Sequence, residues 1–188
     1  MGSIALFRDG ECVLEEREEA QGLRSSGAQN GAVPDALARL RLSPSDITHC
    51  AIGLGPGSFA GIRSALAFLQ GFAAPRRLPI LGISSAAATA KVAQAFLSAH
   101  DAKGDLTILG DARRGHYWVY AQGEMRLVPY AEFTLGTAGN AFSPEAERLC
   151  LAGVRPAIPM ARAVGELALD PSIPKLSPPL PIYLHPAV

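Results

Sequence analysis

The stretch that most constrains this chain runs from Ala51 to Ala74. It begins with an apolar run, Ala51-Ile52-Gly53-Leu54, which is typical of a buried strand. The Gly55-Pro56-Gly57 segment permits a tight turn with positive φ, and Ser58 is a good N-cap for the helix that follows. A strand, a tight turn and a long apolar helix in succession predict a layered α/β domain.

The predicted helix over residues 58–74 has two different sides. At 100° per residue two adjoining arcs form a broad apolar side that should pack on a sheet. One arc comprises Phe59, Ile62, Leu66, Leu69 and Ala73, and the other comprises Gly61, Ala65, Phe68 and Phe72. The other side carries Arg63 and Gln70 beside a row of small residues: Ala60, Ser64, Ala67, Gly71 and Ala74. A helix with a single formal charge should be buried on both sides. Either an internal neighbour, such as the helix predicted at 32–42, or a partner subunit covers the small-residue side.

The rest of the first hundred residues also indicates α/β layering. Two runs flank Asp9-Gly10 and predict a hairpin. Val33, Leu37 and their neighbours have helical spacing over 32–42, and a second apolar strand at 79–83 precedes an alanine-rich helix that ends near Ala99. Strand, helix, strand and helix in this order are typical of parallel α/β layers.

From residue 101 the pattern changes to short strands with little helix. We expect strands at 106–109, 117–121, 125–128 and 149–154, a helix at 159–169, and an extended proline-rich tail. This shift is the basis for a predicted division into two small lobes. The first, residues 1–100, carries the glycine turn and the interface helices, and the second, residues 101–188, is shortened and ends in the tail.

Composition excludes several classes of function. Lys and Arg together number 17, as do Asp and Glu, so no net charge attracts the chain to nucleic acid or to anionic membrane. Three scattered cysteines without zinc-ligand spacing suit a reducing compartment. The most apolar window, 59–74, is too short to span a bilayer. We therefore expect a cytoplasmic protein that does not contact membrane.

The glycine turn matches the dinucleotide fingerprint GxGxxA over Gly55–Ala60, but its context does not support a cofactor. No Asp or Glu occurs between Asp46 and Asp101 to bind the ribose, and no Lys follows as in a phosphate-binding P-loop. A helix start at Ser58 can still hold an anion.

Other polar groups also favour structural roles. The Gly82–Ala86 run resembles a nucleophile elbow, but Ala86 replaces the final glycine, so Ser84 or Ser85 is predicted to cap a helix. Asp111 is predicted to pair with Arg113 or Arg114 at a strand end. The histidines lie far apart without metal-ligand spacing. We expect no catalytic residue and no metal site.

Four segments together resemble the bacterial TsaB (YeaZ) family, whose relatives carry older labels such as glycoprotease-like and peptidase M22. In chain order they are Gly55-Pro56-Gly57-Ser58-Phe59-Ala60-Gly61-Ile62-Arg63, Pro79–Ser85, Asp111-Ala112-Arg113-Arg114-Gly115 and Pro181-Ile182-Tyr183-Leu184. The resemblance implies an α/β fold of the actin/Hsp70-like ATPase (ribonuclease H-like) type. In that fold two small lobes each combine a mixed sheet with helices.

The resemblance also implies a function in tRNA modification. It indicates a non-catalytic scaffold that pairs with a TsaD-type catalytic subunit to make threonylcarbamoyladenosine in tRNAs reading ANN codons. A TsaE-type ATPase joins the assembly, tRNA is contacted indirectly, and ADP or ATP belongs to the interface of the complex rather than to the isolated chain. The implied partner interface, which can also form a homodimer, comprises Val33, Leu37, Ala60, Arg63, Ser64, Ala67, Gly71 and Ala74.

The chain departs from the family pattern near the expected nucleotide cleft. It begins at Met1-Gly2-Ser3, where the first strand of relatives has already ended, so we expect the first sheet to lack a strand, as a misassigned start codon would explain. Ser25–Asn30 stands where relatives tend to have His-Ser. Both departures weaken ATP binding by this chain. Two alternatives stay open: an ATP-dependent enzyme or hydrolase of this fold using Ser84 or Ser58, and a small homodimer that binds an anion at Ser58.

Overall fold

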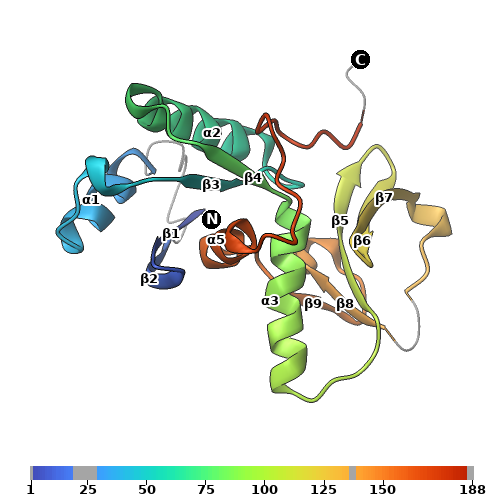
Figure 1. Cartoon of the computed structure of the whole chain (residues 1–188). Helices are drawn as coiled ribbons and strands as arrows, with labels where there is room; N and C mark the ends of the chain where they lie inside the picture. Colours follow the sequence, from blue (N-terminus) through green and yellow to red (C-terminus); the bar gives the residue numbers. More distant parts are fainter. Residues whose placement is uncertain (1, 19–28, 136–138, 186–188) are drawn as a thin grey trace.

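A computed structural model describes residues 2–18, 29–135 and 139–185 (Figure 1). Its strands are β1 (Gly2–Arg8), β2 (Glu11–Glu18), β3 (Cys50–Gly53), β4 (Ile80–Ile83), β5 (Leu106–Arg113), β6 (His116–Ala121), β7 (Glu124–Pro129), β8 (Asn140–Ser143) and β9 (Val154–Pro156). Its α-helices are α1 (Gln29–Arg39), α2 (Phe59–Ala73), α3 (Ser85–Ala99), α4 (Ala146–Leu149) and α5 (Ala161–Leu169), with 3-10 turns η1 (Pro44–Asp46), η2 (Ala74–Arg76) and η3 (Tyr130–Glu132). The α/β class predicted from the sequence is confirmed.

The strands form three sheets in the described residues. β1 and β2 are an antiparallel hairpin, and the Asp9-Gly10 turn between them has the two positive φ angles, 52° and 87°, that such a turn requires. β3 and β4 run parallel and are connected through α2. The remaining strands form one mixed sheet in the order β7-β6-β5-β8-β9.

Two helices hold these sheets together. α3 contacts β5 and β8 on one side and α5 on the other, and its alanines join the core cluster built around Ile108, Trp118 and Phe142. α5 returns to the first half of the chain and packs against both β1 and β3 (Figure 1). Ser3 Oγ accepts a hydrogen bond from the N–H of Ala161, at 2.9 Å. The β1–β2 hairpin and the parallel pair β3–β4 therefore both pack against α5. Among the described residues, no strand is hydrogen-bonded to both of these sheets.

Most elements near the glycine turn lie where the sequence predicts them. Ser58 caps α2 and Ser84 caps α3, each by accepting a hydrogen bond from an N–H of the first helical turn. The strand predicted at 149–154 is wrong, because Cys150 has a positive φ of 50° that ends α4 and separates it from β9. β8 was not predicted. The predicted division into two lobes near residue 100 stays a prediction. α5 follows that point in the sequence but packs against β1 and β3, which precede it.

No helix in the described ranges combines the length and the apolar character that crossing a bilayer requires.

Candidate functional site

The glycine turn is fixed by hydrogen bonds to the start of α3. Gly55 has a φ of +107°, which favours glycine, and a Cβ there would lie 3.2 Å from Ile62 Cδ1. The N–H of Gly55 donates to Ser85 Oγ at 3.0 Å, and the N–H of Ser85 donates to the carbonyl of Gly55 at 2.7 Å. The turn thus connects the start of α2 to the start of α3. Gly55 is needed there because of its positive φ angle.

The C-terminal tail covers the carboxyl ends of β3 and β4. The N–H of Ile182 donates to the carbonyl of Leu54 at 2.8 Å, and the N–H of Leu176 donates to the carbonyl of Gly82 at 2.9 Å. Ile182 also packs on the core cluster of Ile52, Leu54 and Leu66. In a dinucleotide-binding domain the cofactor approaches this edge of the sheet. In this chain, Leu176 and Ile182 of the tail lie at this edge.

The small-residue side of α2 is exposed. Ala60, Ala67, Gly71 and Ala74 are all exposed, Arg63 is exposed beside them, and Ser64 is half-buried. A Cβ added at Gly71 would meet no heavy atom within 4 Å. α1 contacts α2 but leaves these residues uncovered. The sequence leaves two possible covers for this side, an internal neighbour and a partner subunit. No internal neighbour among the described residues buries it, so a partner subunit is favoured.

The two candidate residues on α1 lie in different environments. Leu37 is only 2% exposed, and it is buried because α1 packs against β1 and α2. The assignment of Leu37 to a partner interface is therefore wrong, since its side chain already belongs to the core. Val33 is half-buried and keeps some surface.

Phe59 also departs from the expected pattern. Helical periodicity places it on the apolar side of α2, yet 54% of it is exposed. Its ring lies 5.9 Å from the ring of Tyr183, which is 61% exposed, and the guanidinium of Arg63 lies 5.0 Å from the Phe59 ring centroid. In the sequence, Tyr183 stands out only as part of the Pro181–Leu184 segment, and its exposure is not predicted. An aromatic side chain inside a proline-rich tail is the signal that could have indicated it.

The predicted second-lobe pair forms part of a larger polar cluster. Asp111 pairs with Arg113 at 3.0 Å, as expected, and also with Arg148 at 3.1 Å. Its Oδ1 accepts a hydrogen bond from the Tyr130 hydroxyl at 2.7 Å. That bond, together with Arg113 and Arg148, holds the pKa of Asp111 below its usual value.

The same Tyr130–Asp111 bond raises the pKa of the Tyr130 hydroxyl. Glu145 takes part by accepting from the N–H of Asp111 at 2.7 Å and pairing with Arg148 at 2.5 Å. Two acids and two arginines balance one another, so the cluster is suited to fixing the β5 strand end.

Both serine candidates accept a hydrogen bond at the start of a helix. Ser58 Oγ accepts from the N–H of Gly61 at 3.3 Å, and Ser84 Oγ accepts from the N–H of Ala87 at 3.4 Å. Within the described residues, no group of three or more His, Cys, Asp or Glu side chains could hold a metal ion. These hydrogen bonds support the capping roles predicted for both serines.

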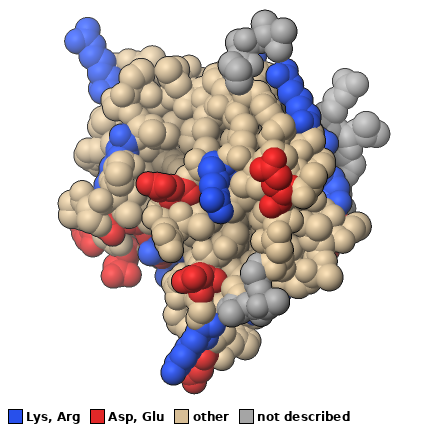
Figure 2. Space-filling view, turned by 90° about the vertical axis from the view of Figure 1, so that its right-hand side faces the viewer, with Lys and Arg blue, Asp and Glu red and all other residues tan. Residues whose placement is uncertain are grey.

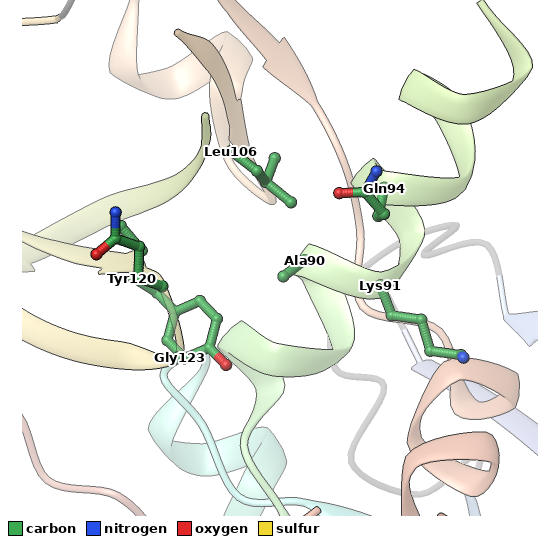
Figure 3. A pocket seen from close by; sticks show the side chains of 8 residues that line it. Ala90, Lys91, Gln94, Leu106, Tyr120 and Gly123 are labelled. Atoms are coloured by element: carbon green, nitrogen blue, oxygen red, sulfur yellow. The ribbon is translucent and has the colours of Figure 1, made fainter. Parts of the chain in front are cut away.

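A shallow hollow of about 280 Å³ lies between α3 and the β6–β7 hairpin (Figure 3). Ala90, Leu106 and Tyr120 border it, while Lys91 turns away and pairs with Glu166 at 3.2 Å. None of the residues singled out in the sequence lines this hollow.

The face on the side of β6 and β7 carries basic and acidic side chains interspersed among uncharged ones (Figure 2). It offers no extended patch of one sign, such as a phosphate backbone would favour.

Comparison with known proteins identifies the family. A family model described as "TsaD: tRNA N6-adenosine threonylcarbamoyltransferase" matches residues 25–168. The tRNA threonylcarbamoyladenosine biosynthesis protein TsaB of Escherichia coli (strain K12) is 32% identical over 137 residues, covering 70% of this chain and 55% of that protein. The chain thus aligns with about half the length of this relative.

Two solved structures from Pseudomonas aeruginosa have the same fold. One, an uncharacterized protein with similarity to peptidase YEAZ, is 25% identical with a TM-score of 0.67, covering 97% of this chain and 94% of that one. The other, YeaZ, is also 25% identical, with a TM-score of 0.65 and coverage of 97% and 93%. Because the family model matches well over half of the chain, the chain belongs to the tRNA N6-adenosine threonylcarbamoyltransferase family, and its resemblance to the TsaB (YeaZ) proteins within it is confirmed.

Proposed function

We propose that this chain is an accessory subunit that pairs with a TsaD-type catalytic subunit for threonylcarbamoylation of adenosine in tRNAs reading ANN codons. The family match and the name of the Escherichia coli relative support the pathway. The observation that carries the scaffold role is the exposed small-residue side of α2, which we call the α2 surface and define as Ala60, Arg63, Ser64, Ala67, Gly71 and Ala74.

The α2 surface suits a helix of another subunit. Small side chains let two helix axes approach to about 8 Å, near the lower limit for packed helices. A largely uncharged helix face left in water is unfavourable and marks an interaction site. Val33 on α1 is half-buried and stays a candidate for the interface, whereas Leu37 is buried.

The division of labour is part of the proposal. The C-terminal tail bonds to Leu54, just before the glycine turn, and the sequence has no carboxylate beside the turn, which supports assigning the transfer chemistry to the TsaD-type subunit. A TsaE-type ATPase joins the assembly in the cytoplasm, and ADP or ATP binds at the interface of the complex. Because the chain has no net charge, tRNA is bound chiefly by the other subunits.

Charge introduced on the α2 surface tests the proposal. The chain and the TsaD-type subunit of the same organism are co-expressed, and complex formation is followed by affinity purification and calorimetry. Ala67→Arg and Gly71→Arg should each weaken the complex by about a hundredfold or more, because a long charged side chain prevents close packing. Both positions are exposed, so the free subunit should melt as the wild type does.

The matched control is Ala95→Arg, which places the same side chain at an exposed alanine on α3. It should bind as the wild type does. If both α2 variants are folded and still pair normally, the assignment of this surface is wrong. If the isolated chain turns over ATP in the presence of magnesium, the non-catalytic role is wrong.

A further inference from the structure

We propose that His116 and His185 form a site for a divalent transition cation such as Zn²⁺, and that the bound ion fastens the C-terminal tail to the turn between β5 and β6. We call this pair the two-histidine site. His116 is the first residue of β6 and His185 lies in the tail, so the two are far apart in sequence. The inference goes beyond the proposed function and does not depend on it.

The fold brings together two imidazoles that no sequence spacing connects. The tail approaches the turn between β5 and β6 (Figure 1), where His185 Nε2 lies 2.8 Å from the carbonyl oxygen of Ala112. The ring centroids of His116 and His185 are 5.8 Å apart, and the ring planes are inclined by 74°. Both residues are half-buried, so solvent and dissolved ions still reach them.

Hydrogen bonds to the backbone decide which nitrogen of each ring carries the proton. His116 Nδ1 lies 2.8 Å from the carbonyl oxygen of Arg114. Because a carbonyl oxygen only accepts, the nitrogen beside it is the N–H donor, which is Nδ1 in His116 and Nε2 in His185. The other nitrogen of each neutral ring keeps its lone pair. Among the described residues, neither His116 Nε2 nor His185 Nδ1 has a hydrogen-bond partner.

This arrangement is the one that prepares histidine to bind a metal. A ligating imidazole in a metalloprotein donates its other N–H to a carbonyl or carboxylate, which fixes the tautomer and the orientation of the ring. Here each of the two rings makes such a bond to a backbone carbonyl. A neutral imidazole nitrogen suits Zn²⁺, Cu²⁺ or Ni²⁺, whereas Mg²⁺ and Ca²⁺ prefer oxygen ligands.

The separation of the rings suits one shared ion. A zinc ion lies about 2.0–2.1 Å from an imidazole nitrogen and therefore about 3.2 Å from the ring centroid. Two rings on the same ion then have centroids about 5.2–6.4 Å apart, as the angle between the two bonds opens from tetrahedral to linear. The observed 5.8 Å lies inside this range. Water completes the coordination, and two protein ligands in place of the four of a structural zinc site make binding reversible.

The neighbouring charges permit a cation at this place. Arg113 pairs with Asp111 at 3.0 Å, which offsets the charge of its guanidinium. Arg114 is exposed, so water and salt screen its charge.

A shared ion changes how firmly the tail is held. Close to His185 along the tail, the N–H of Ile182 donates to the carbonyl of Leu54 at 2.8 Å. The ion binds well only while both imidazoles are together, so it stabilises the state in which the tail lies on the body. Opening of the tail should therefore become rarer by a factor that grows with the ratio of zinc concentration to dissociation constant.

Titration of the full chain with Zn²⁺ alone tests the two-histidine site. Cys150 is exposed, so Cys150→Ser serves as the background and keeps a thiol from binding the metal. Zinc should shift the ring nitrogen resonances of His116 and His185 and leave those of His49 and His100 unchanged. His116→Gln and His185→Gln should each weaken zinc binding in calorimetry by about tenfold or more, because loss of even a second-shell partner has that effect.

The matched control is His49→Gln, which removes an exposed imidazole elsewhere and should bind zinc as the background protein does. A second measurement is hydrogen exchange at the Ile182 amide. At a zinc concentration ten times the dissociation constant, this exchange should slow by up to about tenfold in the background protein and not in the two glutamine variants of the site. Mg²⁺ at the same concentration should have no effect.

The results that would overturn the inference are distinct from those that bear on the proposed function. The site is overturned if zinc leaves the rings of His116 and His185 unchanged, if either glutamine variant binds zinc as tightly as the background, or if Mg²⁺ acts as zinc does. If both rings shift and exchange at Ile182 stays the same, the fastening of the tail is overturned. None of these measurements uses the TsaD-type subunit.

Discussion

Replacing Gly82 by alanine tests how the C-terminal tail is held on the body of the protein. Gly82 lies in β4 without a positive φ, so its backbone conformation suits alanine and only packing decides the effect. An added Cβ would lie 2.3 Å from Leu54 Cδ1, 2.9 Å from the carbonyl oxygen of Leu176 and 3.1 Å from Leu176 Cβ. Leu54 is fully buried, so the added Cβ must displace both the Leu54 side chain and the Leu176 segment of the tail.

The expected cost follows from two contributions. Overpacking of a filled site costs about 1–3 kcal/mol. The hydrogen bond from Leu176 N–H to the Gly82 carbonyl, now 2.9 Å long, would stretch or break at a cost of about 1 kcal/mol. We therefore expect Gly82→Ala to lower the free energy of unfolding by about 2–4 kcal/mol. For a protein of this length that is a drop of roughly 5–15 °C in melting temperature.

Gly71→Ala is the matched control, because it makes the same chemical change in open space. No atom lies within 4 Å of a Cβ at Gly71, and alanine is favoured over glycine inside a helix. We expect this variant to gain about 0.5–1 kcal/mol. Urea unfolding is followed by the fluorescence of Trp118, the only tryptophan, which is buried in the cluster that Leu184 of the tail contacts.

A protease measurement reports on the tail directly. Trypsin cleaves after Lys175, and the next residue, Leu176, makes the bond to Gly82. Cleavage there should be faster in Gly82→Ala than in the wild type, because local opening becomes easier. The reasoning is refuted if Gly82→Ala is as stable as the wild type, or if the two alanine variants change stability in the same direction.

Two further predictions concern single hydrogen bonds. Because the Tyr130 hydroxyl lowers the pKa of Asp111, it stabilises the fold at neutral pH, and that contribution is lost as the pH falls below the usual pKa of an aspartate carboxyl and then through the lowered one. Tyr130→Phe should therefore show a smaller difference in unfolding free energy between neutral and acidic pH; an unchanged difference would contradict this cause. Ser58→Ala should cost about 0.5–1 kcal/mol by removing the cap of α2, and Ser58→Asp, which keeps an acceptor, should restore most of it in urea unfolding; equal losses in both would argue against capping.

The sequence predicts features that depend on residues close together in the chain. The Asp9-Gly10 turn and the caps at Ser58 and Ser84 are of this kind, because glycine conformations and N-cap hydrogen bonds are set within a few residues. β8 is different. Its four residues gain their strand pairing from β5 and β9, which are distant in sequence, so no local pattern identifies it. The apolar run 149–154 looks like a strand, but a left-handed residue at Cys150 divides it.

Periodicity along α2 predicts which residues share a side but not how far the sheet extends beneath them. A helix of 15 residues is about 22 Å long, whereas the strands β3 and β4, with 4 residues each, span only about 13 Å. The helix is therefore longer than the strands it covers, and part of it must extend beyond them. The tail covers one side of the ring through Tyr183 and leaves 54% of Phe59 exposed. Because Phe59 contacts Arg63 of the α2 surface, it would add apolar area to the proposed partner interface along that helix.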